Sequence, residues 1–165
     1  MALFNQFSYI FIGLIAMALT FLALRISRKV PLRTVIGIEV ALAVLLLIGF
    51  FALRPGNNDV ENAETARVMI SSANDKPTFV EFFSNYCTGC LLARPAVDAL
   101  VSEIDGEFNI IRVNIHSTVG RDLRNTYGFT FTPEFVLFGP SGQEIWRAHS
   151  PPNQDAVERA RDRSS

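Results

Sequence analysis

Cys87 and Cys90, the only two cysteines of this 165-residue chain, lie between an aromatic apolar run and a helical pattern. The run over residues 79–83 is typical of a buried strand, and residues 87–104 carry apolar side chains at helical spacing. The pair is therefore expected at a strand-to-helix turn. The free N–H groups and the dipole at a helix N-terminus favour a thiolate, and can lower a cysteine pKa from about 8.5 toward roughly 3.5–7.5. The sequence predicts a nucleophilic cysteine with a resolving partner.

The N-terminal third is apolar enough to place this part of the chain in a membrane. Residues 5–24 carry no charge, and residues 34–53 carry only Glu39. Since about 20 apolar residues span a bilayer, we expect two transmembrane helices in an anchor that covers residues 1–53. A cleaved signal peptide is the alternative for the first helix, but the sequence lacks the basic region that begins such peptides.

The loop expected between these helices, residues 25–33, is basic and contains Arg25, Arg28, Lys29 and Arg33. Because short basic loops stay in the cytoplasm, both termini are expected on the opposite side of a plasma, inner or thylakoid membrane, in a periplasmic, extracellular or lumenal space. An oxidising compartment suits a cysteine pair that cycles between dithiol and disulfide. Neither span contains cysteine, so the protein is expected to need a thiol-shuttling membrane protein as its electron donor.

Residues 54–62 are polar and contain Pro and Gly, which predicts a linker to a domain over residues 63–165. After residue 53 there are 11 Lys and Arg against 15 Asp and Glu, a net charge of −4 without a basic patch, which argues against nucleic-acid binding. The periodicity predicts the order α-β-α-β-α-β-β-α. Helices are expected at 63–72, 87–104, 121–127 and 153–162, and strands at 79–83, 108–115, 134–138 and 144–148.

Several of these features occur together in the thioredoxin superfamily, which residues 63–161 resemble. They are the strand before the cysteine pair, Pro95 five residues after Cys90, and Thr132-Pro133 ahead of a β-hairpin. The resemblance implies an α/β thioredoxin-like fold, a central mixed β-sheet flanked by helices, preceded here by the two transmembrane helices. It is nearest to membrane-anchored, extracytoplasmic thioredoxin-like proteins, including those of cytochrome c biogenesis and of thylakoids.

The resemblance also implies roles for individual residues. Cys87 would attack a substrate disulfide and Cys90 would resolve the mixed disulfide, with Pro133 beside them as a substrate-binding cis-proline. Glu81 falls at the position of a buried acid that helps deprotonate the resolving cysteine, and Arg112 at that of the acid's lysine partner. Two other interpretations stay open from the residues alone: Glu81 at a strand edge in water, and Pro133 as a trans proline opening an edge strand. The redox-active disulfide is the only active group implied, with no cofactor and no metal.

Three residues near the expected site are candidates for substrate binding: Tyr86, Phe131 and Thr132. The two aromatic residues flank the expected active surface and offer apolar area to a substrate segment, although each can also be read as ordinary core. The site departs from the thioredoxin pattern in three places. Tyr86 replaces a tryptophan, Thr-Gly replaces Gly-Pro between the cysteines, and Phe131 stands where glycine is common.

The favoured hypothesis is a membrane-anchored thiol–disulfide oxidoreductase that reduces extracytoplasmic protein disulfides. A disulfide oxidase is the same chemistry in the opposite direction, since such couples range from about −270 to about −120 mV. A different class is a Cu(I)-binding metallochaperone that uses the cysteine pair with His116 or His149. No second Cys or His pair is spaced to complete a four-ligand zinc site. An interaction domain with an idle cysteine pair is a third hypothesis.

Overall fold

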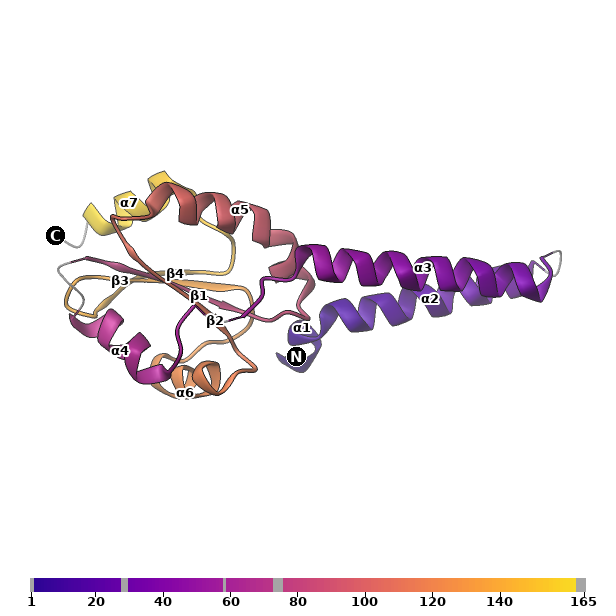
Figure 1. Ribbon diagram of the computed structural model, residues 1–165, viewed down its shortest axis with the longest axis horizontal. Coiled ribbons are helices and arrows are strands. Elements are labelled where there is room, and N and C mark those ends of the chain that lie inside the picture. The colour runs from indigo at the N-terminus through magenta and orange to yellow at the C-terminus, as the bar shows by residue number, and fades with distance from the viewer. Residues whose placement is uncertain (1, 28–29, 58, 73–75, 163–165) are drawn as a thin grey trace.

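The computed structural model describes residues 2–27, 30–57, 59–72 and 76–162, which form a sheet domain with a two-helix rod projecting from it (Figure 1). The chain begins with three helices, α1 (Ala2–Gln6), α2 (Ser8–Ile26) and α3 (Leu32–Leu53). The domain follows as α4 (Ala63–Ser72), β1 (Thr78–Phe83), α5 (Thr88–Ile104), β2 (Asn109–Asn114), α6 (Thr118–Tyr127), β3 (Glu134–Phe138), β4 (Glu144–Ala148) and α7 (Gln154–Asp162).

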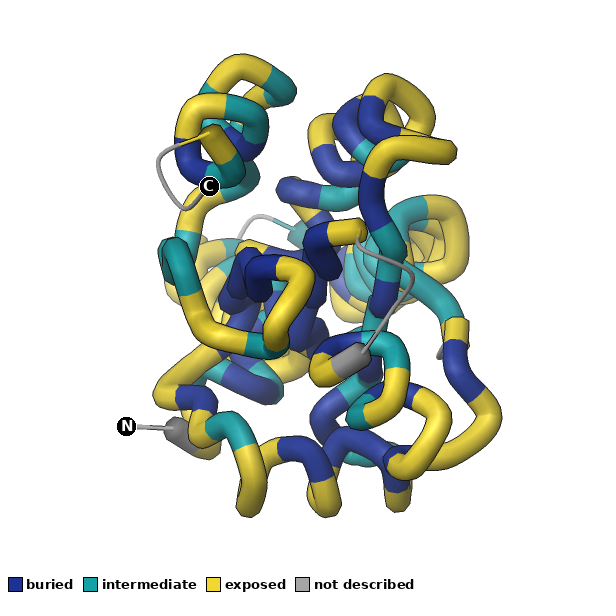
Figure 2. The backbone as a smooth tube through the Cα atoms, turned by 90° about the vertical axis from the view of Figure 1, so that its left-hand side faces the viewer, coloured by how far each residue is buried: buried dark blue, intermediate teal, exposed yellow. Residues whose placement is uncertain are grey.

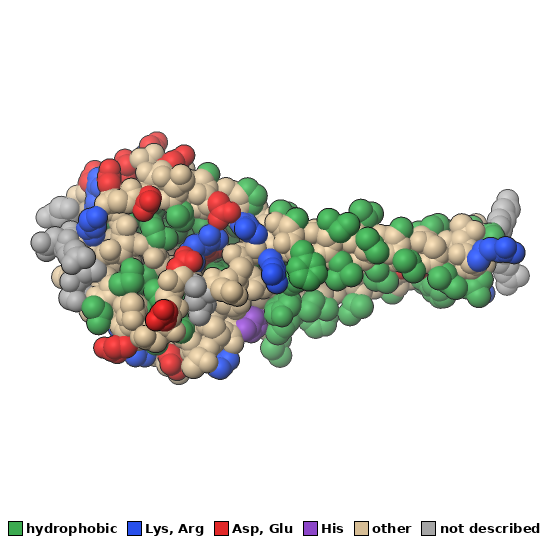
Figure 3. Space-filling model, in the orientation of Figure 1, with side chains coloured by type: hydrophobic (Ala, Val, Ile, Leu, Met, Phe, Trp, Pro, Cys, Tyr) green, Lys and Arg blue, Asp and Glu red, His purple; other side chains and the backbone are tan. Residues whose placement is uncertain are grey.

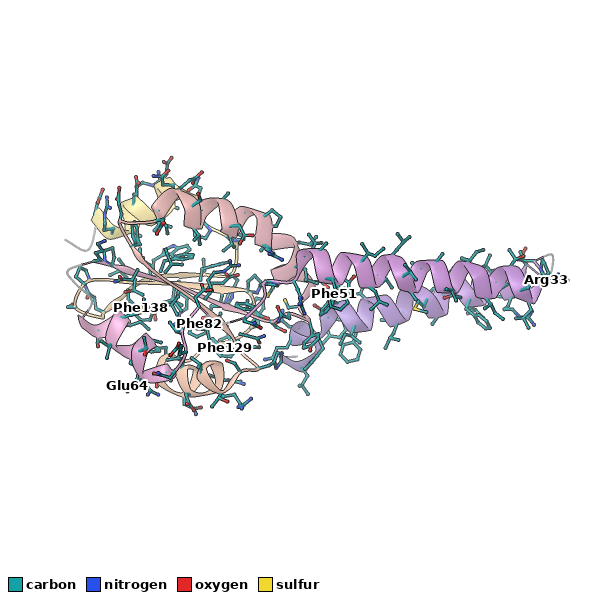
Figure 4. All side chains as sticks on the ribbon, in the orientation of Figure 1. Arg33, Phe51, Glu64, Phe82, Phe129 and Phe138 are labelled. Atoms are coloured by element: carbon teal, nitrogen blue, oxygen red, sulfur yellow. The ribbon has the colours of Figure 1, made fainter. Side chains whose placement is uncertain are left out.

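The rod consists of α2 and α3, which by length and composition are apolar enough to cross a membrane. Only 6% of the apolar window of each helix is buried, so neither helix is enclosed in a protein core. Hydrophobic side chains cover the rod in Figure 3, and basic side chains gather at its far end. Figure 4 places Arg33 at that end and Phe51 at the domain end. Arg28 and Lys29 of the predicted basic loop lie outside the described residues.

The first apolar helix begins later than its expected start near residue 5. Phe7 leaves helical geometry, with φ −119° and ψ 20°, and separates the short α1 from α2. The residues around this break contact the sheet domain. The backbone N–H of Tyr9 donates to the carbonyl of Tyr86, and that of Thr88 donates to the hydroxyl of Ser8. The beginning of the chain is therefore held against the domain.

The sheet has the order β2-β1-β3-β4, in which β1 is parallel to β2 and antiparallel to β3, and β4 is antiparallel to β3. This mixed four-stranded sheet flanked by helices is the thioredoxin-like fold that the sequence predicted. The hairpin strands lie at the predicted residues, while β2 is one residue shorter at each end. Helix α6 begins three residues before its predicted start because the Ser117 hydroxyl caps it, accepting from the N–H of Gly120 at 2.9 Å.

Alternation along β1 divides the core into two layers, since successive side chains point to opposite faces of a sheet. Val80 and Phe82 pack in a cluster that takes residues from α4 and α6, whereas Phe79 packs in a cluster from α5 and α7. Figure 4 labels Phe82, Phe129 and Phe138, which belong to the first cluster. Figure 2 shows the buried backbone gathered at the centre of the domain and the exposed turns at its outside.

Segment 54–62, expected as a linker, is tied to the domain at several points. Val60 is buried in the core, and the N–H of Asp59 donates to the carbonyl of Arg112. Gly56 exchanges two hydrogen bonds with the side chain of Asn85, at 3.0 and 2.8 Å. Asn58, within this segment, lies outside the described residues, as does part of the turn predicted after α4, Ala73, Asn74 and Asp75.

Candidate active site

The cysteine pair lies where the sequence placed it, between the end of β1 and the start of α5. Cys87 is the N-cap residue of α5, with φ −93° and ψ 119°, and its Sγ accepts from the N–H of Cys90 at 3.4 Å. Both thiols are free and both residues are buried, Cys87 with 1% of its surface exposed and Cys90 with none. The helix N-terminus therefore directs its unpaired N–H groups at the first sulfur, where a thiolate is stabilised.

The two thiols differ in acidity. A hydrogen bond from the Cys90 thiol is the largest influence that lowers the pKa of Cys87, and with Thr132 and the backbone N–H groups of the helix start it brings that pKa to about 6. Burial raises the pKa of Cys90 well above its ordinary value, and the neighbouring Cys87 raises it further. At neutral pH Cys87 is therefore a thiolate and Cys90 a thiol, the states needed for a nucleophile and a proton-holding partner.

The Thr132–Pro133 peptide bond is cis, as the resemblance implied, and it lies against the cysteine pair. Sγ of Cys87 lies 3.3 Å from the carbonyl oxygen of Thr132, to which its protonated form donates. Gly89 permits this approach, because a Cβ at that position would lie 3.2 Å from Cδ of Pro133. The Thr-Gly pair between the cysteines thus has a packing reason for its glycine.

Glu81 has no solvent exposure, which excludes the interpretation as a strand-edge residue in water. It shares a face of β1 with Phe83, which clusters with both cysteines. Arg112, its neighbour in the β1–β2 register, donates from Nε to Oε2 of Glu81 at 2.6 Å and from Nη1 to Asp98 at 2.8 Å. Burial raises the pKa of Glu81 although Arg112 opposes the shift. Burial therefore favours the protonated form of Glu81 relative to a solvated glutamate.

The predicted substrate-binding aromatic residues have different surroundings. The Tyr86 ring stacks on Phe7 at 5.6 Å and on Phe50 of α3 at 5.8 Å, and it remains 36% exposed. Phe131 remains 42% exposed and stacks on His149 at 4.1 Å. Their roles in substrate binding stay predictions, as do those of Glu81, Arg112, Pro133 and Thr132. Pro95 lies inside α5, where it leaves one backbone carbonyl without its helical donor.

Sequence reasoning missed two polar residues that shape the site. Ser84 directly follows β1 and its N–H donates to Cys90 Sγ at 3.5 Å, while its hydroxyl lies 3.0 Å from Nε2 of His116. Glu134, expected only as the start of a strand, is fully buried, forms an ion pair with Arg147 and accepts from the N–H of Thr130 at 2.8 Å. It therefore braces the loop that carries the cis-proline.

Neither histidine joins the cysteine pair as a metal ligand. His116 contacts Ser84, and Nδ1 of His149 lies 3.1 Å from the carbonyl oxygen of Pro133. Within the described parts of the chain, no group of three or more His, Cys, Asp and Glu side chains is arranged to hold a metal ion. In the described residues, the Cu(I) hypothesis therefore has the two cysteine thiols as its metal ligands and no histidine beside them.

This geometry and fold define a class, the thiol–disulfide oxidoreductases built on a mixed sheet with a cysteine pair at a helix start. The thioredoxin family profile matches residues 59–160, and the chain belongs to this family.

The chain is similar to a thiol:disulfide interchange protein and to a thioredoxin. The chain is 26% identical over 124 residues to the thiol:disulfide interchange protein TxlA of Synechococcus elongatus, covering 71% of this chain and 64% of that protein. It is 29% identical over 65 residues to chloroplastic thioredoxin M4 of Arabidopsis thaliana, which covers 39% of this chain and 33% of the relative. The chain therefore spans a third to just under two thirds of these two proteins. The crystal structure of oxidised mitochondrial thioredoxin 3 from Saccharomyces cerevisiae has the same fold, with a TM-score of 0.50 and 18% identity over 70% of this chain and 98% of the other.

Proposed function

We propose that this protein is a membrane-anchored thiol–disulfide oxidoreductase that reduces protein disulfides outside the cytoplasm. One observation carries the proposal: a Cys87 whose pKa is about 6 caps a helix beside a buried Cys90 of raised pKa and a cis-proline. The Cys87 thiolate attacks one sulfur of a substrate disulfide and expels the other as a thiolate. A mixed disulfide between Cys87 and the substrate results.

Cys90 resolves this intermediate. It gives up its proton and attacks Sγ of Cys87, which releases the second substrate sulfur as a thiolate. Two electrons pass to the substrate, and the protein is left with a Cys87–Cys90 disulfide. Glu81 takes the Cys90 proton, because its raised pKa and its place on the cysteine-facing side of β1 suit a proton acceptor. A donor must then reduce the disulfide, and with no cysteine in either apolar helix that donor is a second, thiol-shuttling membrane protein.

The acidity of Cys87 supports the reducing direction. Strong disulfide oxidants stabilise their reduced form through nucleophilic cysteines with a pKa near 3.5, whereas the reductant thioredoxin has a value of about 7. The value of about 6 for Cys87 is closer to the reductant.

Two features support the membrane anchor and its orientation. Helices α2 and α3 are long and apolar, and Arg33 lies at the end of the rod remote from the domain. Basic residues at that end favour its retention in the cytoplasm, and this supports a position of the domain, and of the end of α3 next to it, on the other side of the membrane. The relatives reported above are a thioredoxin and a thiol:disulfide interchange protein, and a role in cytochrome c biogenesis stays a prediction from the resemblance.

Trapping tests the proposal. The Cys90→Ser variant, expressed in cells, should accumulate mixed disulfides through Cys87 that dithiothreitol releases. The matched control is the double variant Cys87→Ser/Cys90→Ser, which should trap nothing. If Cys90→Ser forms no mixed disulfide, the exchange mechanism is wrong. A reporter fused to the C-terminus tests orientation separately, and activity of that reporter on the cytoplasmic side would contradict the extracytoplasmic placement.

A further inference from the structure

A cysteine that attacks protein disulfides must be reached by them, yet Cys87 has only 1% of its surface exposed. Part of its cover comes from its own domain, since the thiol contacts the carbonyl of Thr132. The remainder of the site is approached by residues Asn5–Tyr9, at the break between α1 and α2. We call this segment the strap.

The strap makes its most specific contact through Asn5. The side-chain amide of Asn5 donates to the carbonyl of Thr132 at 2.8 Å, and the side-chain oxygen of Asn5 accepts from the N–H of Thr132 at 2.8 Å. The Thr132 hydroxyl lies 3.2 Å from the same oxygen. A carboxamide offers one donor and one acceptor side by side, as a peptide group of a neighbouring strand does. Asn5 thus pairs with Thr132 as an added strand would.

Other contacts hold the strap in this place. The Ser84 hydroxyl donates to the carbonyl of Gln6 at 2.8 Å, and the N–H of Thr88 donates to the Ser8 hydroxyl at 2.9 Å. The ring of Phe7 packs against those of Tyr86 and His116, with centroid distances of 5.6 and 5.0 Å, and these two rings also contact each other at 6.0 Å. Ser84, Tyr86 and Thr88 lie between the end of β1 and the start of α5, on either side of Cys87, and His116 follows β2.

We propose that Asn5 is a specificity-determining residue that occupies the backbone of Thr132, and with it the approach to Cys87, until a substrate polypeptide displaces it. This inference rests on the proposed function, to which it adds a segment of the same chain that competes with the substrate. A peptide strand can replace both Asn5 hydrogen bonds with its own main chain, as in other cases of strand addition. A disulfide whose flanking groups cannot pair with Thr132 replaces neither.

The test compares Asn5→Ala with wild type in the reduced full-length protein in detergent micelles. Leu3→Ala is the matched control, because Leu3 is on the same short helix, outside the strap, and 72% exposed. The first readout is the rate of Cys87 alkylation by iodoacetamide, and the second is the rate of insulin reduction with dithiothreitol as donor. Asn5→Ala loses two neutral hydrogen bonds to the Thr132 main chain and one to its hydroxyl, which should accelerate both rates roughly 5- to 30-fold, with Leu3→Ala unchanged.

The two readouts separate this inference from the proposed function. Equal alkylation rates in Asn5→Ala and wild type would contradict the proposal that Asn5 limits access to Cys87. Faster alkylation without insulin reduction in any form of the protein would support the strap's cover of Cys87 and contradict the reductase. Equal acceleration by Leu3→Ala would overturn the assignment to Asn5, because a general loosening of α1 would then explain the effect.

Discussion

Nε of Arg112 and Oε2 of Glu81 lie 2.6 Å apart, and through this contact a carboxylate without solvent exposure is linked to the protein surface. The same guanidinium group donates to Asp98, whose side chain is 45% exposed. Isolated buried charges are costly, and a cation that reaches the surface lowers this cost without removing it. Burial raises the pKa of Glu81, and Arg112 opposes this shift without reversing it.

Replacement of the buried acid should separate the two steps of disulfide exchange. We expect Glu81→Gln to leave the first attack by Cys87 near its wild-type rate and to slow the release of the mixed disulfide on the order of 10²-fold, because the Cys90 proton loses its acceptor. Stopped-flow measurement of both phases checks this, with Glu144→Gln on the exposed side of β4 as control. Unchanged release in Glu81→Gln would remove Glu81 from the mechanism.

The reactivity of Cys87 should follow its protonation. Only the thiolate reacts, so the alkylation rate is expected to rise with pH through a midpoint near 6. In Cys90→Ala the midpoint should move to higher pH, because the hydrogen bond from Cys90 is the largest influence that lowers the Cys87 pKa. Rates of iodoacetamide labelling between pH 4 and pH 9 measure both midpoints. Identical midpoints would mean that the helix start alone sets the acidity.

The ion pair between Arg147 and Glu134, next to the cis-proline loop, should contribute to the free energy of unfolding. Arg147→Ala leaves the fully buried Glu134 without its cation, and we expect a loss of about 3–5 kcal/mol in the free energy of unfolding. Arg159→Ala breaks an exposed pair with Asp155, and should cost less than about 1 kcal/mol. Urea unfolding followed by the fluorescence of Trp146, the chain's single tryptophan, reports on the domain in either variant. Equal losses would contradict the assignment of a structural role to Glu134.

Close packing at the start of α6 gives a further prediction. A Cβ at Gly120 would lie 2.2 Å from the carbonyl oxygen of Asn114 and 2.8 Å from Cα of Ile115. Both neighbours are backbone atoms that can move only with β2, so Gly120→Ala should destabilise the domain by roughly 1–3 kcal/mol. Gly37→Ala is the control, because its Cβ would meet no atom within 4 Å. Urea unfolding followed by Trp146 fluorescence measures the free energy of unfolding of both glycine variants.

Elements with a regular pattern were predictable from the sequence. Helix α5 and the β3–β4 hairpin carry apolar residues at helical or alternating spacing between clear turn residues, and their predicted bounds differ from the structure by no more than one residue. The centre of the site was predictable for a related reason. Cys87 and Cys90 are adjacent in sequence to the strand and helix that position them.

Contacts between residues far apart in the sequence could not be predicted, because no regular spacing of residues marks them. Asn5 and Thr132 are 127 positions apart, and their pairing depends on how the N-terminal helices pack against the domain. Glu134 was not predicted to be buried, because acidic residues at strand starts are ordinarily solvated and Arg147 reaches it only through the β3–β4 register. Tyr86 was expected to flank the active surface and remains 36% exposed, but its stacking on Phe50 depends on the same packing of the rod.

The hydrogen bonds between the end of α3 and the domain affect which substrate disulfides the cysteine pair can reach. Arg94 of α5 donates to the carbonyls of Arg54 and Ala52 at the end of α3, and Asn85 clasps Gly56 two residues further on. With the rod embedded in a bilayer, as proposed, these bonds hold the domain close to the end of α3. The cysteine pair then stays near the membrane surface, so a client must present its disulfide at a matching distance from the lipid.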